Sequence, residues 1–572
     1  MRLQPVFDIA AICSAKGIKD AIVCPGSRCA PLTLSFARHP GIQTRTISDE
    51  RSAGFIALGI AQQTRKTVVL ICTSGTAAYN LAPAIAEAYY QRTPLLVLTA
   101  DRPVEWIGQW DGQTVSQQKI YGDHVLKSYQ LPQDYDHADS KWSIQRIINE
   151  AVNHTQGDIQ GPVHVNVPLR EPLYPPPGEK ITFSNDIQIT ERIATKVMIP
   201  PKVLQQLSTQ LDQYKKVLVV GGQGSLSVNL IASLNAFATA GNIAVVGDVI
   251  SNLHPMPSVI RYTDAFMPAL DEKTRKDLQP ELLISIGQSV ISKNLKLFLR
   301  ANKPMAHWHV DEWAGDIIDP FQSLTTQIRQ SPEDFFATLA KTVSQNTGRR
   351  EYAERWSALE VKASQVVEDF FETETSGELA LVNHVMRSVP DHSNVHLANS
   401  MSVRYANFCG LAENKKGVQI FSNRGTSGID GCTSTVVGHA LGSEALHTLI
   451  TGDVAFFYDR NAFWNNYRTP NLRIIVLNNH GGAIFGMIDG PGSTPEASEY
   501  FITQQPLTAK HLATEFNIDY KLISDTGNIQ ATLEEFFKVD GRPKILEFES
   551  GSKEAKDLFL RFKEKIKNAY AA

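Results

Sequence analysis

The sequence has few cysteines for its length. Its 572 residues include only six, and no two of them form a Cys-x-x-Cys pair. A chain of this length can bury enough apolar surface to fold without disulfide staples. A disulfide-stapled scaffold is therefore excluded, and a reducing, cytoplasmic compartment is expected.

Long apolar runs and an excess of positive charge are also missing. No stretch approaches the roughly 18 consecutive apolar residues that cross a bilayer, and residues 1–4 lead into a mixed helix rather than a signal-peptide core. The 55 Lys and Arg residues face 59 Asp and Glu residues, for a net charge of -4. A protein that binds the phosphate backbone needs a basic excess. We therefore expect neither nucleic acid nor a membrane as a partner.

The composition is that of an ordinary folded protein. Hydrophobic residues make up 42% and charged residues 20% of the chain, which is far from the disordered or collagen-like extremes. The length favours three or four domains, and no short-period repeat of the solenoid kind is present.

Short aliphatic runs that end abruptly in small or polar residues recur along the chain, and helix-like segments follow them. This pattern predicts an α/β fold with three doubly wound parallel-sheet domains. The predicted strands are residues 21–24, 67–72, 95–99 and 163–167, then 216–222, 243–247, 282–287 and 305–310, and finally 395–398, 418–422, 448–451, 473–477 and 544–548.

Proline-rich and charged segments connect the three sets of predicted strands. The proline-rich stretch 173–178 predicts a boundary, a charged helical stretch covers about 331–380, and residues 553–567 have the periodicity of an amphipathic helix. We expect domains at 1–175, 190–345 and 375–572.

Two loops in the last third carry the strongest chemical signal. Gly452-Asp453 ends one predicted strand, and Asn478-Asn479-His480-Gly481-Gly482 ends a later one. A carboxylate, an amide oxygen and a backbone carbonyl form an all-oxygen set suited to octahedral Mg²⁺, which completes its shell with phosphate oxygens and water. Either loop alone could be a helix cap or a turn.

Glu50 lies just before a helix of small apolar residues, 53–61. Any helix N-terminus favours an acidic residue, so Glu50 alone indicates little. Together with the two loops and a middle domain between them, it makes the chain resemble thiamine-diphosphate-dependent enzymes. In that superfamily the first domain binds the cofactor's aminopyrimidine and the last binds its diphosphate, across a subunit interface.

The resemblance implies specific roles. Glu50 would hydrogen-bond the pyrimidine and drive the tautomerism that deprotonates the thiazolium carbon. Asp453, Asn479 and the Gly481 carbonyl would hold Mg²⁺ or Mn²⁺, and Gly452 and Gly482 would help to bind the cofactor. Active sites between subunits imply a homo-oligomer, either a dimer or a tetramer.

Four motifs make the resemblance narrower. They are Pro-Gly-Ser-Arg at 25–28, Thr-Ala-Asp-Arg-Pro at 99–103, Ser-Asn-Arg-Gly-Thr-Ser-Gly-Ile-Asp-Gly at 422–431 and Asn-Asn-His-Gly-Gly-Ala-Ile-Phe at 478–485. In this order they resemble the 2-succinyl-5-enolpyruvyl-6-hydroxy-3-cyclohexene-1-carboxylate (SEPHCHC) synthase family of menaquinone biosynthesis. That family decarboxylates 2-oxoglutarate and adds the succinyl carbanion equivalent to isochorismate by 1,4-addition, giving SEPHCHC and CO₂.

Both of these substrates are dicarboxylates, so the site should carry guanidinium groups. Arg28, Arg102, Arg404 and Arg424 all lie at or just beyond predicted strand ends. A surface salt bridge is the default interpretation of any single arginine, but four in such loops favour anion binding.

The resemblance assigns further contacts. Substrate or intermediate contacts fall to Ser27, Gln113, Lys293 and Ser400. Ile429 would be the apolar wedge that bends the cofactor, and Ile484, Phe485 and Ile488 would line the reactive cavity. Ordinary core packing is the alternative for these four apolar residues. His480 and His124 receive no role, and proton transfer would fall to the cofactor's imino group and a water.

Three alternatives stay open on the sequence alone. One is another thiamine-diphosphate enzyme, such as an acetohydroxyacid synthase or an oxidase with FAD in its middle domain. Another is a NAD-binding dehydrogenase built on Gly221-Gly222-Gln223-Gly224, with Asp248 as the ribose-binding acid. The third is a binding protein that keeps the fold without the chemistry.

Overall fold

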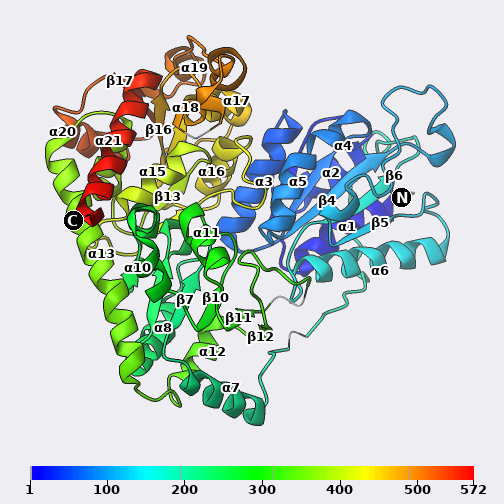
Figure 1. Ribbon diagram of the computed structural model, residues 1–572. Helices are drawn as coiled ribbons and strands as arrows, with labels where there is room; N and C mark the ends of the chain where they lie inside the picture. Colours follow the sequence, from blue (N-terminus) through cyan, green and yellow to red (C-terminus); the bar gives the residue numbers. More distant parts are fainter. Residues whose placement is uncertain (1–2, 194, 313–314, 488–489, 572) are drawn as a thin grey trace. The chain divides into compact units, whose positions relative to one another are not determined.

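The computed structural model describes residues 3–193, 195–312, 315–487 and 490–571. Within them, three six-stranded parallel sheets are flanked by helices (Figure 1), which confirms the predicted fold class. The chain divides into two compact units. Unit 1 contains residues 1–195, 423–444 and 455–472, and unit 2 contains 196–422, 445–454 and 473–572.

The sheet of unit 1 has the order β2-β1-β3-β4-β6-β5. Its central strands are buried along their whole length, as in a sheet covered on both faces. Helices α1 (Gln4–Ala15), α2 (Ala30–Arg38) and α6 (Ala138–Thr155) cover one face, and α3 (Glu50–Thr64), α4 (Thr76–Asn80) and α5 (Ala82–Tyr90) lie on the other. The strands are β1 (Asp20–Val23), β2 (Gln43–Thr46), β3 (Val68–Cys72), β4 (Leu95–Asp101), β5 (Lys127–Gln130) and β6 (Val163–Pro168).

Unit 1 also takes in α16 (Cys432–Leu441), which packs along α3. The two helices meet at glycines. A Cβ atom on Gly59 would overlap the carbonyl oxygen of Thr435, and one on Gly438 would overlap the carbonyl oxygen of Ile56. The backbones are therefore too close for any side chain at these two positions.

The first sheet of unit 2 has the order β12-β11-β10-β7-β8-β9. Helices α7 (Pro201–Gln213), α8 (Val228–Gly241) and α12 (Pro332–Leu339) cover one face, and α9 (Thr263–Phe266), α11 (Lys293–Ala301) and the long α13 (Thr347–Thr373) pack on the other. The strands are β7 (Val217–Gly221), β8 (Ala244–Gly247), β9 (Val259–Ile260), β10 (Leu282–Ile286), β11 (Ala306–Asp311) and β12 (Thr326–Arg329).

The second sheet of unit 2 has the order β14-β13-β15-β16-β18-β17. Its strands are β13 (Asn394–Leu397), β14 (Gln419–Phe421), β15 (His447–Gly452), β16 (Leu472–Asn478), β17 (Asp519–Ile523) and β18 (Lys544–Glu549). Helices α14 (Glu378–Ser388), α15 (Met401–Cys409), α20 (Ile529–Phe537) and α21 (Ser552–Ala571) contribute to its core. The shorter helices α18 (Ile484–Met487) and α19 (Lys510–Glu515) follow β16, α10 (Glu272–Asp277) precedes β10 of the first sheet, and α17 (Asp453–Tyr458) begins in unit 2 and ends in unit 1.

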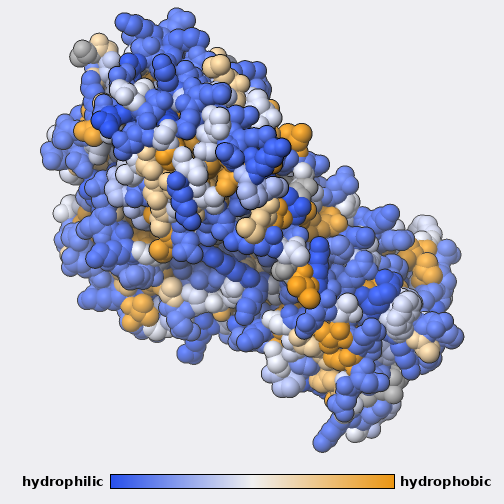
Figure 2. All heavy atoms as spheres, turned by 90° about the horizontal axis from the view of Figure 1, so that it is seen from below, coloured by the Kyte–Doolittle hydropathy of each residue, from blue (hydrophilic) through white to orange (hydrophobic). Residues whose placement is uncertain are grey.

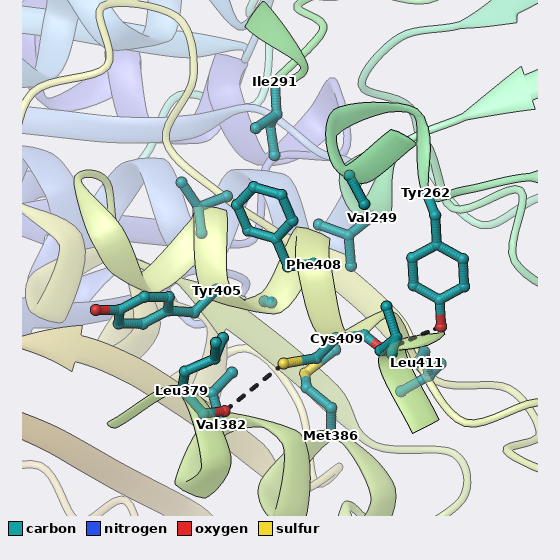
Figure 3. Packing of buried hydrophobic residues seen from close by; sticks show 14 of the residues in the cluster. Val249, Tyr262, Ile291, Leu379, Val382, Met386, Tyr405, Phe408, Cys409 and Leu411 are labelled. Atoms are coloured by element: carbon teal, nitrogen blue, oxygen red, sulfur yellow. Dashed lines mark hydrogen bonds between the residues drawn. The ribbon is translucent and has the colours of Figure 1, made fainter. Parts of the chain in front are cut away.

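The larger of two hydrophobic clusters in the described part of unit 2 includes residues from both of its sheets (Figure 3). Tyr262 follows β9 and donates a hydrogen bond from its hydroxyl to the Cys409 carbonyl at 3.3 Å, while the Cys409 thiol faces the Leu379 carbonyl at 3.8 Å. The predicted C-terminal helix is confirmed as α21, whose buried face is Ala555, Leu558, Phe559, Phe562 and Ile566.

Every predicted strand has a counterpart in the structure, but β2, β5, β9, β12 and β17 were not predicted. All six cysteines are free and buried. In the described part of the chain, no helix combines the length and apolarity that a bilayer span requires. The face shown in Figure 2 is mainly hydrophilic, with apolar residues in small groups.

Candidate active site

A cavity of about 580 Å³ lies where the sheet of unit 1 changes winding direction. Strand β2 lies on one side of β1 and β3 lies on the other, so the loops after β1 and β3 flank the crevice where such sheets bind ligands. The cavity lining is Pro25, Gly26, Glu50, residues 73–77, Asn80, Asp111, Gln113, Thr114 and Val115. Glu50 and Gln113 are thus brought together.

Glu50 is the first residue of α3, and a capped helix end holds it there. The side chain of Asp49 accepts hydrogen bonds from the backbone N–H groups of Arg51 and Ser52, as an N-cap residue does. Asn461 adds a third hydrogen bond at 2.7 Å, from its Nδ2 to the Asp49 carboxylate. Glu50 itself accepts one long hydrogen bond of 3.4 Å, from Asn80, so its carboxylate is available to a ligand.

In the second sheet of unit 2, the loops after β13 and β15 flank the equivalent crevice. Asp453 follows β15 and is 1% exposed. Burial raises the pKa of its carboxyl group, and hydrogen bonds from Gln505 and from the backbone of Val454 and Gly481 oppose that rise. The Gln505 bond is 2.7 Å long. The structure therefore brings Asp453 together with the loop that follows β16.

Asn479 lies in that second loop with its amide buried. Its Nδ2 donates to Glu378 Oε1 at 2.8 Å, but its Oδ1 has no hydrogen-bond partner among the described residues. A buried oxygen without a donor is costly, and a bound cation would supply the missing partner. An unpartnered amide oxygen near a carboxylate and a glycine carbonyl fits the hard-oxygen preference of Mg²⁺.

Close packing explains why this loop has glycine at positions 481 and 482. A Cβ atom on Gly481 would lie 2.7 Å from the Ile502 carbonyl oxygen, and the Gly482 N–H donates to that same carbonyl at 2.7 Å. His480 between Asn479 and Gly481 is engaged elsewhere, since its ring lies 3.2 Å from the Gln505 carbonyl and 3.1 Å from Glu549 Oε1.

Two of the four arginines hold loops of unit 1. Arg28 donates to the Leu169 carbonyl at 3.0 Å and pairs with Glu171 at 3.3 Å. Arg102 donates to the Gly112 carbonyl at 2.9 Å, beside Gln113. Both guanidinium groups therefore have backbone partners in addition to any anion that they would bind.

The other two arginines are Arg404, in α15, and Arg424, in the loop that follows β14. The guanidinium of Arg404 in unit 2 donates to the Ser400 carbonyl at 2.5 Å, and burial lowers its pKa. Arg424 precedes Gly425 in unit 1, where the buried carboxylate of Glu87 accepts hydrogen bonds from Gly425 and Thr426.

The remaining predicted contacts are scattered over both units. Ser27 is exposed after β1, Lys293 is the exposed first residue of α11, and Ile429 is half-buried. Ser400 adopts a φ of +74° immediately before α15, a conformation that L-residues seldom adopt.

The three apolar positions at 484–488 differ from one another. Ile484 packs against the core of unit 2, and the Phe485 ring lies 6.0 Å from that of Phe501. Ile488 falls outside the described residues.

Sequence reasoning missed three residues that support the site: Glu378, Gln505 and Glu87. Each acts on its partner across a long stretch of chain, 101 residues for Asn479, 52 for Asp453 and 338 for Gly425. No local pattern relates positions so far apart.

The loop that follows β7 bears on the alternative that this chain is a NAD-binding dehydrogenase. The first sheet of unit 2, read from β9, has the strand order 3-2-1-4-5-6 that dinucleotide-binding folds use. The loop after β7 is held against β10 and the loop that follows it by backbone hydrogen bonds, from the Gly222 N–H to the Ile286 carbonyl at 2.8 Å and from the Gln223 N–H to the Ser289 carbonyl at 2.7 Å. A Cβ atom on Gly222 would overlap the Gln288 carbonyl, so this glycine serves loop packing. Asp248 accepts a hydrogen bond from the Ile291 N–H at 2.5 Å.

Comparison with known proteins agrees with this geometry. Residues 6–123 match the family model "Thiamine pyrophosphate enzyme, N-terminal TPP binding domain", and residues 194–397 match "Middle domain of thiamine pyrophosphate". The chain is 44% identical to a 2-succinyl-5-enolpyruvyl-6-hydroxy-3-cyclohexene-1-carboxylate (SEPHCHC) synthase of Cytophaga hutchinsonii, over 99% of this chain and 100% of the relative. The chain belongs to the SEPHCHC synthase family.

Two further relatives with the same name agree. The one from Flavobacterium johnsoniae is 37% identical over 94% of both chains, and the one from Desulfotalea psychrophila is 36% identical over 95% of this chain and 98% of its own. Membership of the SEPHCHC synthase family confirms the resemblance inferred from the four motifs. It also identifies the chain as a thiamine-diphosphate-dependent enzyme. The NAD-binding dehydrogenase and the non-catalytic binding protein are thereby disfavoured.

Proposed function

We propose that this enzyme decarboxylates 2-oxoglutarate and adds the resulting succinyl unit to isochorismate by 1,4-addition, giving SEPHCHC and CO₂ in menaquinone biosynthesis. The observation that carries the proposal is the 44% identity to a SEPHCHC synthase over nearly the whole chain. The crevices of the first and last sheets support it, because each presents residues suited to one end of thiamine diphosphate.

The metal belongs to the crevice of the last sheet. Asp453, the Asn479 amide oxygen and the Gly481 carbonyl would hold Mg²⁺ or Mn²⁺, with phosphate oxygens of the cofactor as further ligands. The unpartnered Oδ1 of Asn479 supports this assignment, because a buried oxygen of that kind needs a positive partner. Gly452 and Gly482 would allow the diphosphate to approach the backbone.

When bound, thiamine diphosphate supplies the nucleophilic carbon that attacks the 2-oxo acid. Glu50 would hold and exchange a proton at a ring nitrogen of the aminopyrimidine. Its position on a capped, closely packed helix supports that role, since general acid–base catalysis depends on a well-placed group. Ile429, Ile484, Phe485 and Ile488 would shape the surrounding cavity and exclude water.

The carboxylates of both substrates would bind the arginines, with Ser27, Gln113, Lys293 and Ser400 as neutral or single-point partners. Guanidinium groups already held by carbonyl oxygens are preorganised, which lowers the entropic cost of binding.

We further propose a cytoplasmic homo-oligomer, a dimer or tetramer with active sites between subunits. The functional domains would be a pyrimidine-binding domain at 1–175, a central domain at 190–345 and a diphosphate-binding domain at 375–572.

The test is the ultraviolet absorbance of isochorismate, followed with 2-oxoglutarate, thiamine diphosphate and Mg²⁺ present and with each omitted in turn. We expect loss of isochorismate only in the complete mixture. Decarboxylation of 2-oxoglutarate without loss of isochorismate would show that the acceptor is wrong. Turnover that survives chelation of the divalent ion would contradict the metal assignment.

A further inference from the structure

Glu378 is a buried carboxylate that the proposed chemistry does not use. It is the first residue of α14 and is 1% exposed. Its Oε1 accepts hydrogen bonds from Asn479 Nδ2 at 2.8 Å and from the Ser550 hydroxyl at 3.3 Å. Burying a carboxylate costs free energy, so its position calls for a physical reason.

The reason lies in the asymmetry of the Asn479 amide. An amide has a donor end and an acceptor end of nearly the same shape, so packing alone does not decide which end points where. The Glu378 Oε1 accepts hydrogen bonds from both Asn479 and the Ser550 hydroxyl, so it acts as an acceptor at this position. It therefore attracts the Asn479 NH₂ group and turns Oδ1 to the other side, where that oxygen is buried and has no hydrogen-bond partner among the described residues.

Reversing the amide would be unfavourable on both sides. Oδ1 would face the Glu378 oxygen, acceptor against acceptor, and the NH₂ group would take the position of the oxygen. An amide NH₂ carries positive partial charge and repels a cation. The orientation of the Asn479 amide thus decides whether the loop offers a ligand or a barrier.

We propose that Glu378 is a positioning residue that holds the Asn479 amide with its oxygen facing the divalent cation. This inference rests on the proposed role of Asn479 as a metal ligand. Partners that orient a metal ligand in this way typically change metal affinity by about 10- to 100-fold when they are replaced.

The readout is binding of Mn²⁺ to the full-length protein with thiamine diphosphate present, measured from the electron paramagnetic resonance signal of free Mn²⁺. We expect Glu378→Gln to weaken Mn²⁺ binding about 10- to 100-fold, because a glutamine can donate to Oδ1 and so allow the amide to turn. Glu378→Asp keeps an acceptor-only group and should retain more of the affinity. Ser550→Ala removes the other donor to Oε1 and is the matched control, with affinity unchanged within about twofold.

A double-mutant cycle separates orientation from structural support. In the Asn479→Asp background both ends of the side chain are oxygens, so orientation no longer matters and Glu378 adds a repulsive charge. Glu378→Gln should there leave Mn²⁺ affinity unchanged or raise it. An equal loss in both backgrounds would overturn the inference in favour of a merely structural role.

The outcomes also separate this inference from the proposed function. If the unmodified protein binds no Mn²⁺ in the presence of cofactor, the metal site and the inference both fall. If it binds Mn²⁺ and folded Glu378→Gln binds it equally well, only the inference is overturned. Should Glu378→Gln fail to fold, Glu378→Met, which also removes the acceptor that orients the amide, replaces it in both backgrounds.

Discussion

Glu50 is the residue on which the proposed proton transfer depends. It occupies a helix end that Asp49 caps and that faces the cavity of unit 1. The hydrogen bond that its carboxylate accepts from Asn80 is 3.4 Å long. The carboxylate therefore contributes little to the stability of the fold, and its replacement should affect catalysis more than folding.

We expect Glu50→Gln to lower kcat by about 100- to 10,000-fold, the range that a positioned acid–base group contributes. The thermal midpoint should stay within a few degrees of the parent value, because no strong hydrogen bond is lost. Stopped-time assays of isochorismate loss and calorimetry measure the two quantities. Substantial residual turnover in this variant would rule out the proposed role.

Asp459 provides a pH-dependent prediction. This carboxylate is fully buried near the start of α16, where it accepts hydrogen bonds of 2.6 and 2.7 Å from the backbone and hydroxyl of Ser434. Burial raises its pKa from 3.8 to about 7, although the Ser434 hydrogen bonds and the Arg51 charge oppose the rise. The folded state therefore favours the protonated form.

The sign follows from linkage. A folded pKa above the unfolded pKa contributes stability that is complete below about pH 4 and is lost as the pH rises to about 7. The change is of the order of a few kcal/mol. We expect the thermal midpoint of the parent protein, relative to that of Asp459→Asn, to fall between about pH 4 and pH 7 and to change little above pH 7. Parallel curves for the two proteins would contradict the assignment.

At the scale of elements, the contact between α3 and α16 depends on two glycines. A Cβ atom on Gly59 or Gly438 would meet a backbone carbonyl of the other helix, and backbone atoms cannot move aside as a side chain can. Overpacking typically costs about 1–3 kcal/mol and sometimes more.

We therefore expect Gly59→Ala to cost about 3 kcal/mol, the upper end of the overpacking range, and to lower the thermal midpoint by roughly 5 °C or more. Gly442→Ala, at the end of α16, is the matched control. Its Cβ atom would lie 3.5 Å from the nearest atom of Gln63, so we expect a change within about 1 kcal/mol. Calorimetry of both variants decides the point. Equal midpoints would show that the helices separate easily.

The elements also show what the sequence could and could not predict. The predicted strands lie inside the sheets or, in the case of β14, at one edge, and β3 shows why, since it is apolar and buried throughout. The strands that were missed are all at sheet edges, and most are polar and partly exposed, such as β5 with the sequence Lys-Ser-Tyr-Gln. An edge strand is covered less and does not need a continuous apolar run.

The same limit applies to the candidate site. Asp453, Asn479 and Gly481 stand in short motifs that follow apolar strands, so their chemistry could be recognised from local sequence. Glu378 and Gln505 reach the same site through folding of distant segments. Only the three-dimensional arrangement relates them to the residues that they hold.

At the scale of the whole molecule, the proposed assembly can be tested by dilution. If active sites form between subunits, a monomer should be inactive, because no single chain would complete a site. We expect specific activity to fall as the enzyme is diluted through its dissociation range, together with a drop in the sedimentation coefficient. Full specific activity in a sample that sediments as a monomer would contradict the shared site.

Unit 1 is assembled from three separate stretches of chain, and the last of them ends at residue 472. A ribosome delivers these stretches in order, so the first sheet and α3 emerge long before α16. At about 5–20 residues per second, synthesis from residue 195 to residue 441, where α16 ends, takes roughly 12 to 50 seconds. During that time the face of α3 that carries Gly59 has no α16 to pack against, and it remains exposed unless a chaperone covers it.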